Sequence, residues 1–253
     1  MSISKLNYIE REFKESDLSY MPVSFRVIGY GDSFLDLIQE IKHIGYEGLQ
    51  ADVLSEGASF TPTDEDRMTI FLCSSECRGL ESLLNTFHQA GVLTIVISTD
   101  SLNVPTQSYD SLMVAGRNEM ISVVKSLLNP VFYQGRINYD FNDLVYTLRD
   151  SYHFITLTAA GSGTDRMKNA VTSLSNMFPI DEGVENMSLF IRANDRVIEP
   201  PLCIGEMSLI TDYVGRLPES VNVIWAMYND ETLDCHTVGL SVIASGKDMD
   251  ITR

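Results

Sequence analysis

Short, mostly apolar runs alternate with amphipathic stretches through the first half of the chain. The runs at 24–28, 68–73 and 92–98 are typical of buried strands. Between them, apolar residues recur at helical spacing in two stretches, 33–44 and the one that begins at Leu80. This strand–helix alternation predicts a parallel sheet with helices on both faces.

The first half ends with weaker signals. We expect a loop at 101–108, a short strand at 112–115 and a helix at 119–128. Asn129-Pro130 should end that helix, because proline has no N–H to donate within it. We therefore place a boundary between two subdomains here.

The second half alternates again. A glycine turn at 161–166 should open a helix, and the strands at 221–228 and 237–244 are expected to form a hairpin through 229–232. Other expected elements are a helix at 141–149, strands at 152–158 and 188–192, and a helix at 205–216. The predicted fold class is α/β. The predicted division is an N-terminal arm (1–21), a first subdomain (22–117), a central helix and linker (118–134) and a second subdomain (135–253).

Composition limits the kinds of partner and the compartment that we expect for this protein. The chain has 253 residues, 44% of them apolar, and a formal net charge of -17. Such a surface repels nucleic acid and anionic lipid, so we expect neither nucleic-acid nor direct membrane binding. A charged N-terminus, no long apolar run and only four cysteines predict a cytoplasmic protein with free thiols.

The most informative segment is Asn138-Tyr139-Asp140-Phe141-Asn142-Asp143, which we call the acid loop. Its two carboxylates, three residues apart, fall on one face of the first turn of a predicted helix. One interpretation is a helix cap, with Asp140 at the N-cap and Asp143 complementing the helix dipole. The other interpretation is a functional pair of acids.

From 135 onward the chain resembles the C-terminal half of FtsZ, a bacterial relative of tubulin. Three motifs carry this resemblance in collinear order: the acid loop, the glycine turn at 161–166, and the closing segments at 222–226 and 239–246. The resemblance implies a divergent FtsZ/tubulin fold, in which a Rossmann-like first subdomain and an α/β second subdomain are joined by a central helix. In that family the acids corresponding to Asp140 and Asp143, with the residue corresponding to Asn138, reach the next subunit's GTP and polarise the attacking water.

The first half departs from the family where the phosphates should bind. In place of a Gly-Gly-Gly-Thr-Gly type loop stands the segment Cys73-Ser74-Ser75-Glu76-Cys77-Arg78-Gly79. Phosphates need backbone N–H donors that can be approached closely, yet Glu76 brings negative charge there, as Asp32 does at the first turn. We therefore expect no catalytic residue acting in cis and no GTPase activity. GTP or GDP is the only cofactor that the resemblance implies, and Gly29, Gly31 and Asn118 match its residual contacts.

These observations predict a non-catalytic FtsZ-like protein that caps or regulates FtsZ-type filaments through the acid loop. Two alternatives stay open: a nucleotide-binding switch or weak GTPase with a reshaped site, and a self-associating scaffold unrelated to division. Only seven residues follow Gly246, so the family's adaptor-binding tail is not expected and any membrane attachment would be indirect.

Other motifs are weaker. Gly29-Tyr30-Gly31 followed by Asp52 suggests a dinucleotide fingerprint, but its third glycine would be Phe34, and a tight strand-to-helix turn explains the glycines as well. Cys73 with Cys77, and Cys235 with His236, have spacings seen in metal sites, yet no further ligand lies near, so we expect no metal. The remaining histidines, His88 among them, have the pattern of packing or surface residues. No Ser/His/Asp arrangement is evident.

Overall fold

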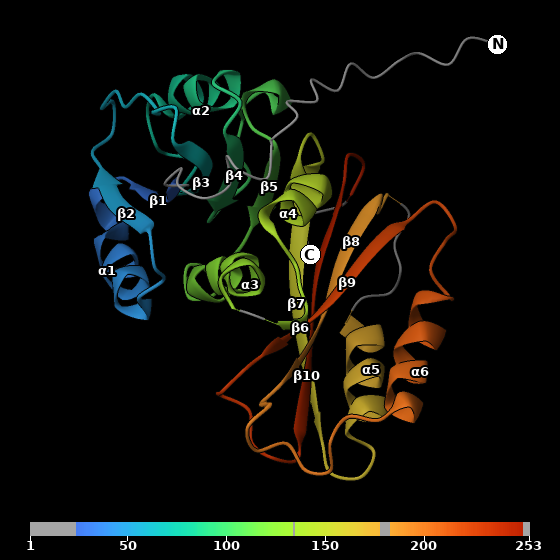
Figure 1. Ribbon diagram of the computed structural model, residues 1–253. Helices are drawn as coiled ribbons and strands as arrows, with labels where there is room; N and C mark the ends of the chain where they lie inside the picture. Colours follow the sequence, from blue (N-terminus) through green and yellow to red (C-terminus); the bar gives the residue numbers. More distant parts are fainter. Residues whose placement is uncertain (1–23, 134, 178–182, 250–253) are drawn as a thin grey trace, which may run out of the picture.

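The computed structural model describes residues 24–133, 135–177 and 183–249, so the predicted arm lies outside it. The described residues form one ten-stranded sheet in the order β2-β1-β3-β4-β5-β7-β10-β8-β9-β6 (Figure 1). The strands are β1 (Ser24–Tyr30), β2 (Leu49–Leu54), β3 (Asp66–Cys73), β4 (Leu93–Ser98), β5 (Ser111–Val114), β6 (Gly135–Ile137), β7 (Tyr152–Ser162), β8 (Asn186–Ala193), β9 (Asn222–Asn229) and β10 (Thr237–Gly246). The helices are α1 (Leu35–Ile44), α2 (Leu80–Gln89), α3 (Met120–Phe132), α4 (Phe141–Leu148), α5 (Arg166–Met177) and α6 (Ile204–Val214), with 3-10 turns η2 (Asp32–Phe34) and η3 (Thr106–Ser108).

The first five strands in this order are parallel, and the central ones, β1, β3 and β4, are buried on both faces, which confirms the layered sheet predicted for the first half. In Figure 1, α2 lies above these strands and α1 and α3 lie below them. Neighbouring residues along β1 face opposite cores: Val27 packs with α1 and α3, and Ile28 packs with α2. Strands buried on both faces are apolar at nearly every position, which is why they were recognisable in the sequence.

The second half of the sheet is mixed, and the predicted hairpin is wrong. β10 pairs antiparallel with both β7 and β8, while β9 lies parallel to β8 on its far side. The connection from β8 to β9 runs through α6, and a crossover of this kind returns the chain in the same direction and makes a parallel pair. β8 therefore separates the two strands that adjoin each other in sequence. β2 and the short edge strand β6 were not predicted.

Helix α3 does not end at Asn129-Pro130; it continues to Phe132. Pro130 lies near the C-terminal end, where its missing N–H removes a single backbone hydrogen bond. Pro130 is buried together with Leu127 and Leu128, and Tyr133 N–H still donates to Asn129 O at 2.8 Å. The free energy gained by burying this face of α3 outweighs the cost of the backbone hydrogen bond missing at Pro130.

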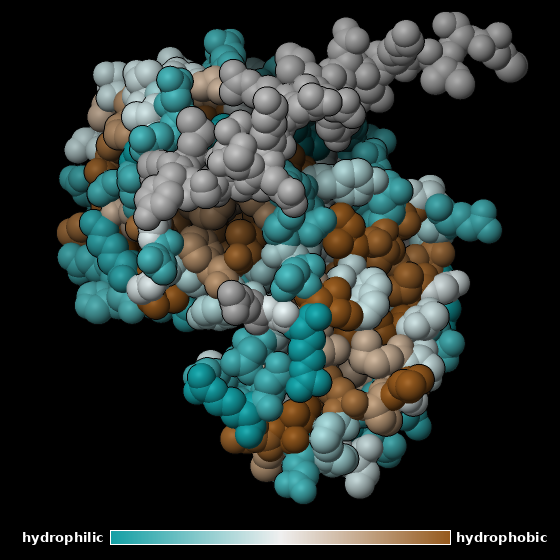
Figure 2. Space-filling model, in the orientation of Figure 1, coloured by the Kyte–Doolittle hydropathy of each residue, from teal (hydrophilic) through white to brown (hydrophobic). Residues whose placement is uncertain are grey.

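Three apolar clusters form the core, and the largest one crosses the predicted boundary between subdomains. Phe25 of β1 packs against Phe132 of α3 and Phe141 of α4, with ring centroids 5.6 and 5.2 Å apart. A second cluster underlies α5 and α6, which lie side by side in Figure 1. On the face shown in Figure 2, apolar residues gather over this half of the molecule. The subdomain limits themselves stay a prediction.

None of the helices in the described part of the chain is long and apolar enough to span a membrane.

Candidate functional site: the acid loop and the acidic hollow

The acid loop forms a complete capping box at the start of α4. Asp140 Oδ1 accepts hydrogen bonds from the backbone N–H groups of Asn142 (2.7 Å) and Asp143 (3.1 Å). In return, Asp143 Oδ2 accepts from Asp140 N–H at 3.0 Å. These hydrogen bonds confirm the interpretation of Asp140 and Asp143 as a helix cap. The cap leaves Asp140 and Asn138 exposed and Asp143 half-buried, with both carboxylates held in one orientation.

Tyr139, between the two polar residues Asn138 and Asp140, anchors the loop to the sheet. Its hydroxyl lies 2.8 Å from Ser188 Oγ of β8, which in turn lies 2.7 Å from Thr147 Oγ1 of α4. The ring packs edge-on against Phe190, with centroids 4.8 Å apart, and its burial raises the pKa of the phenol. The sequence analysis assigned Tyr139 no role; a lone aromatic between exposed polar residues was the available signal.

Strand β6 fixes the chain just before the loop. It pairs with β9, and a side chain at Gly135 would meet Met227 O at 1.9 Å, so only glycine fits there. Arg136 forms an ion pair with Asp195 at 3.0 Å. The loop is thus held before its start by the pairing of β6 with β9, at its end by the cap of α4, and in its middle by Tyr139.

The second feature is a hollow of about 440 Å³ beyond the carboxyl ends of β1, β2 and β3, where an open parallel sheet usually binds its ligand. We call it the acidic hollow. It is lined by Gly31, Asp32, Ser33, Ser55, Glu56, Ser74, Glu76 and Cys77. Three of these eight residues are acidic and none is basic, so a phosphate group would face carboxylates at close range.

Three backbone donors of the segment 73–79 are already used. Ser75 N–H donates to Asp100 Oδ2 at 3.0 Å, Cys77 N–H to Ser74 O at 3.2 Å, and Arg78 N–H makes a long bond to Glu56 Oε2 at 3.5 Å. The hydrogen bonds from Ser75 and Thr99 lower the pKa of Asp100 and keep it ionised. A phosphate cradle needs such N–H groups free, so the residues present do not fit the phosphates of GTP or GDP.

Tyr30, the middle residue of the Gly-x-Gly turn, holds the loops beside the acidic hollow in place. Its wholly buried side chain donates a hydrogen bond to Arg78 O (2.6 Å) and accepts one from Gly57 N–H (2.8 Å). Cys77 Sγ–H donates to Tyr30 O at 3.2 Å. The Tyr30 side chain thus joins two loops beside the acidic hollow, one at Gly57 and one at Arg78.

Of the three residues predicted to contact a nucleotide, Gly29, Gly31 and Asn118, only Gly31 lines the acidic hollow. Gly31 lines the acidic hollow at φ 108°, a conformation that favours glycine. Gly29 lies within β1, where a side chain would meet Phe34 Cβ at 2.8 Å. The absence of a side chain lets the residues around the start of α1 pack closely against the strand. Asn118 is exposed in the turn before α3 and is not among the residues that line the hollow.

Arg117, the neighbour of Asn118, makes the contacts in this region instead. Its guanidinium donates to Ser33 O and Asp36 Oδ1 and lies over the Phe34 ring, 5.3 Å from the centroid. It ties the start of α3 to the start of α1. Arg117 was not predicted from the sequence to have a role here.

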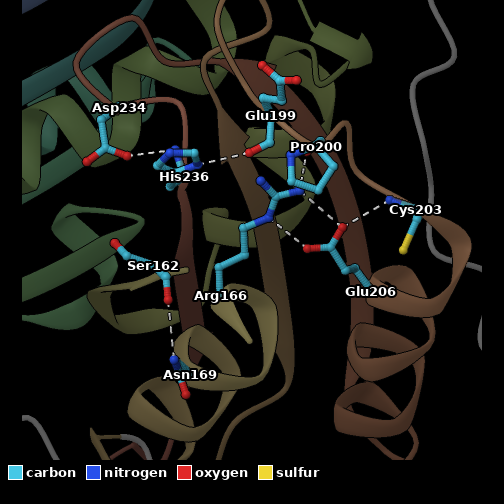
Figure 3. Close-up of polar contacts among 9 residues, drawn as sticks. All are labelled: Ser162, Arg166, Asn169, Glu199, Pro200, Cys203, Glu206, Asp234 and His236. Atoms are coloured by element: carbon cyan, nitrogen blue, oxygen red, sulfur yellow. Dashed lines mark hydrogen bonds and ion pairs between the residues drawn. The ribbon is translucent and has the colours of Figure 1, made fainter. Parts of the chain in front are cut away.

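The predicted glycine turn is a structural junction. β7 runs through Gly161 to Ser162, and Arg166 at the start of α5 is 2% exposed. Figure 3 shows its guanidinium pointing at Glu206 of α6, with Nε–Oε1 at 2.8 Å and Nη2–Oε2 at 3.2 Å; Nη2 also donates to Pro200 O at 2.6 Å. Glu206 Oε2 in turn accepts from Cys203 N–H at 3.0 Å. No phosphate loop is formed here.

Cys73, Cys77 and Cys235, singled out for their metal-like spacings, lie outside the one group of metal-ligating side chains found among the described residues. Cys73 is buried and Cys203 is exposed, and all four are free thiols. One group of metal-ligating side chains does occur in the described ranges: His88, Asp110 and Asp150. Sequence reasoning missed it because the three residues lie far apart along the chain.

Comparison with known proteins supports the resemblance. No family model matches the chain. The chain is 26% identical over 145 residues to the cell division protein FtsZ of Porphyromonas gingivalis, a match that covers 57% of this chain and 32% of that protein. The aligned part therefore spans about a third of the length of that relative.

Solved structures share the fold at low identity. An FtsZ W319Y mutant of M. jannaschii superposes with a TM-score of 0.69 at 16% identity, covering 88% of this chain and 91% of the other. TubZ-Bt in a four-stranded filament gives 0.64 at 10% identity, with 90% and 87% covered. The GDP-bound CetZ1 monomer of Haloferax volcanii gives 0.60 at 12% identity, with 90% and 96% covered. The sequence match and the superpositions together show that this chain is similar in sequence to an FtsZ and shares the fold of FtsZ, TubZ and CetZ1.

Proposed function

We propose that this protein binds FtsZ-type filament subunits through its acid loop and does not hydrolyse GTP by itself. The observation that carries the proposal is an asymmetry between its two candidate surfaces. The acid loop is capped and anchored as a rigid acidic projection. The acidic hollow has carboxylates and occupied donors where a nucleotide phosphate would lie.

The mode of action follows from the family resemblance. A subunit that offers the acid loop can dock on the nucleotide-bearing face of an FtsZ-type subunit. It offers no nucleotide face in return, so a filament that accepts it stops growing at that end. Asp140 and Asp143 would act in trans, where fixed carboxylates orient a water at the partner's nucleotide.

Self-association is the second candidate, supported by the filament in which TubZ-Bt was solved. Charge argues against a head-to-tail arrangement of identical subunits. It would place Asp140 and Asp143 against Asp32, Glu56 and Glu76 of the next copy, and like charges at a contact are repulsive. A different, nucleotide-loaded partner removes that conflict.

The test is GTP turnover and pelleting of FtsZ from the same organism, with this protein added in steps and also alone. We expect a change at substoichiometric dose and no turnover by this protein alone. The decisive variant is Asp140→Asn with Asp143→Asn, because asparagine oxygens still accept the capping hydrogen bonds while both charges are lost. Asp212→Asn, an exposed carboxylate on α6, is the matched control. If the double variant acts on FtsZ as well as the wild type does, the acid-loop mechanism is wrong.

Nucleotide binding is tested separately. A bound nucleotide would stabilise the fold by mass action and raise the unfolding temperature. We expect no such shift with GTP, GDP, ATP or NAD. A shift that grows with GTP concentration would favour the reshaped-switch alternative.

A further inference from the structure

Three metal-ligating side chains meet at the edge of the sheet opposite the acidic hollow. His88 lies near the end of α2, Asp110 directly precedes β5, and Asp150 lies in the turn between α4 and β7. One ligand atom from each lies within 4.8 Å of the other two. They converge because β4, β5 and β7 are neighbouring parallel strands, whose starts fall at the same edge.

We propose that His88, Asp110 and Asp150 form a binding site for a divalent transition-metal ion, with Zn²⁺ as the best match. One imidazole nitrogen and two carboxylate oxygens are a donor set that zinc accepts, with a fourth position left for water. The proposal does not rest on the proposed function of the acid loop or on any partner. It revises the expectation from sequence that the chain binds no metal and that His88 only packs.

Asp110 is the fixed member of the set. It is fully buried, with Oδ2 accepting from Thr94 N–H at 2.7 Å and Oδ1 from Asp150 N–H at 3.3 Å. Outer hydrogen bonds of this kind orient metal ligands.

His88 supplies an unsatisfied nitrogen. Its Nδ1 is closed to solvent, lies 3.5 Å from Asp110 Oδ2 and makes no hydrogen bond. A buried polar atom without a partner is costly, and a metal ion is one way of satisfying it.

Asp150 gives the site access to solvent. Its side chain is exposed, and its backbone at φ 54° places it in the left-handed region. Ligands of a tetrahedral zinc ion lie about 3.3 Å apart, so binding requires each separation in the group to close by at most about 1.5 Å.

A bound ion would join the end of α2 to the turn that follows α4. Helix α4 has eight residues, or about 12 Å, and carries the acid loop at its other end. The ion would therefore fix the helix on which the acid loop is built.

The experiment uses the full chain freed of metal with EDTA. Titration calorimetry with ZnCl₂ should show one site, weakened at least about 10- to 100-fold in His88→Ala and in Asp150→Asn, because a direct ligand should matter no less than an outer-shell partner. His43→Ala, an exposed histidine on α1, and Cys235→Ser should bind as the wild type does. Circular dichroism confirms that each variant is folded.

Cobalt absorption of the wild-type protein supplies a readout that needs no variant. With Co²⁺ in the site, visible d–d bands should appear without a thiolate charge-transfer band, because no cysteine is a ligand. The proposal is overturned by absence of stoichiometric zinc binding, by binding that survives both ligand variants, or by a thiolate band.

Discussion

Two buried tyrosines hold the two candidate surfaces in place. Tyr139 fastens the acid loop to β8, and Tyr30 joins the loops around the acidic hollow. Each combines a ring packed in the core with a hydroxyl that satisfies buried polar groups. At this scale, chemistry that looks functional in the sequence is partly structural: the carboxylates of the acid loop cap a helix, and the Gly-x-Gly turn holds an aromatic side chain rather than a phosphate.

Tyr30→Phe is expected to destabilise the fold by about 1–3 kcal/mol, because Gly57 N–H and Arg78 O both lose their partner while the ring stays buried. Urea unfolding followed by circular dichroism measures the change. Tyr146→Phe, whose ring is 49% exposed on α4, serves as the control and should be nearly neutral. Equal effects in the two variants would contradict the role of the Tyr30 hydroxyl in joining the two loops.

Asp140→Ala should cost about 1 kcal/mol, since two N–H groups at the start of α4 lose their acceptor. Asp140→Ser should recover most of that loss because serine is also a good N-cap. The comparison of the two variants by thermal unfolding separates capping from charge. Equal destabilisation by alanine and serine would show that the cap contributes little.

At the scale of elements, a buried ion pair fixes how α5 and α6 lie against the second half of the sheet. Arg166 and Glu206 are bonded through two atom pairs, at 2.8 and 3.2 Å. Burial opposes ionisation of Glu206, but the hydrogen bonds from Arg166 and Cys203 outweigh it and lower the pKa of this carboxyl. Removing one partner of such a pair leaves an uncompensated buried charge.

The lowered pKa of Glu206 makes this contact sensitive to acid. A carboxyl whose folded pKa lies below its unfolded value of 4.5 stabilises the protein above that pH, and the contribution is lost as the pH falls through the folded pKa. We expect the unfolding free energy of the wild type to drop below about pH 4.5, and Glu206→Gln to show a shallower drop over the same range. Parallel curves for the two proteins would contradict the assignment.

Arg166→Met, tested at neutral pH, should lose about 3–5 kcal/mol, because Glu206 is left charged and half enclosed. Chemical denaturation measures the loss. Arg196→Met is the control, since its ion pair with Glu231 is exposed on both sides and surface pairs contribute little. A similar loss in both variants would show that burial is not the cause.

At the scale of the whole molecule, the two halves share a sheet and a core. The joint in the sheet is short, since β5 and β7 pair through only Ser111–Tyr152 and Leu112–His153. The largest apolar cluster extends across this short joint, where Phe25 packs on Phe141, and so adds side-chain contacts between the two halves. Shared burial of this kind couples the stability of the two halves.

Guanidinium unfolding should therefore be a single transition. The only tryptophan, Trp225, lies on β9 in the second half, so its fluorescence reports that half, while far-ultraviolet circular dichroism reports both. We expect coincident midpoints by the two probes. Separate midpoints would mean that the subdomains unfold independently.

The sequence by itself determined whatever depends on neighbours along the chain. Central strands such as β4 and helices such as α2 follow from local periodicity, and the cap at Asp140 follows from residues three apart. Tertiary structure decided what depends on distant partners. It placed β8 between β9 and β10, carried α3 past Pro130, joined two loops through the Tyr30 hydroxyl and brought His88, Asp110 and Asp150 together. The physical reason is that strand order and side-chain convergence are set by how the whole core packs, and no local pattern encodes that.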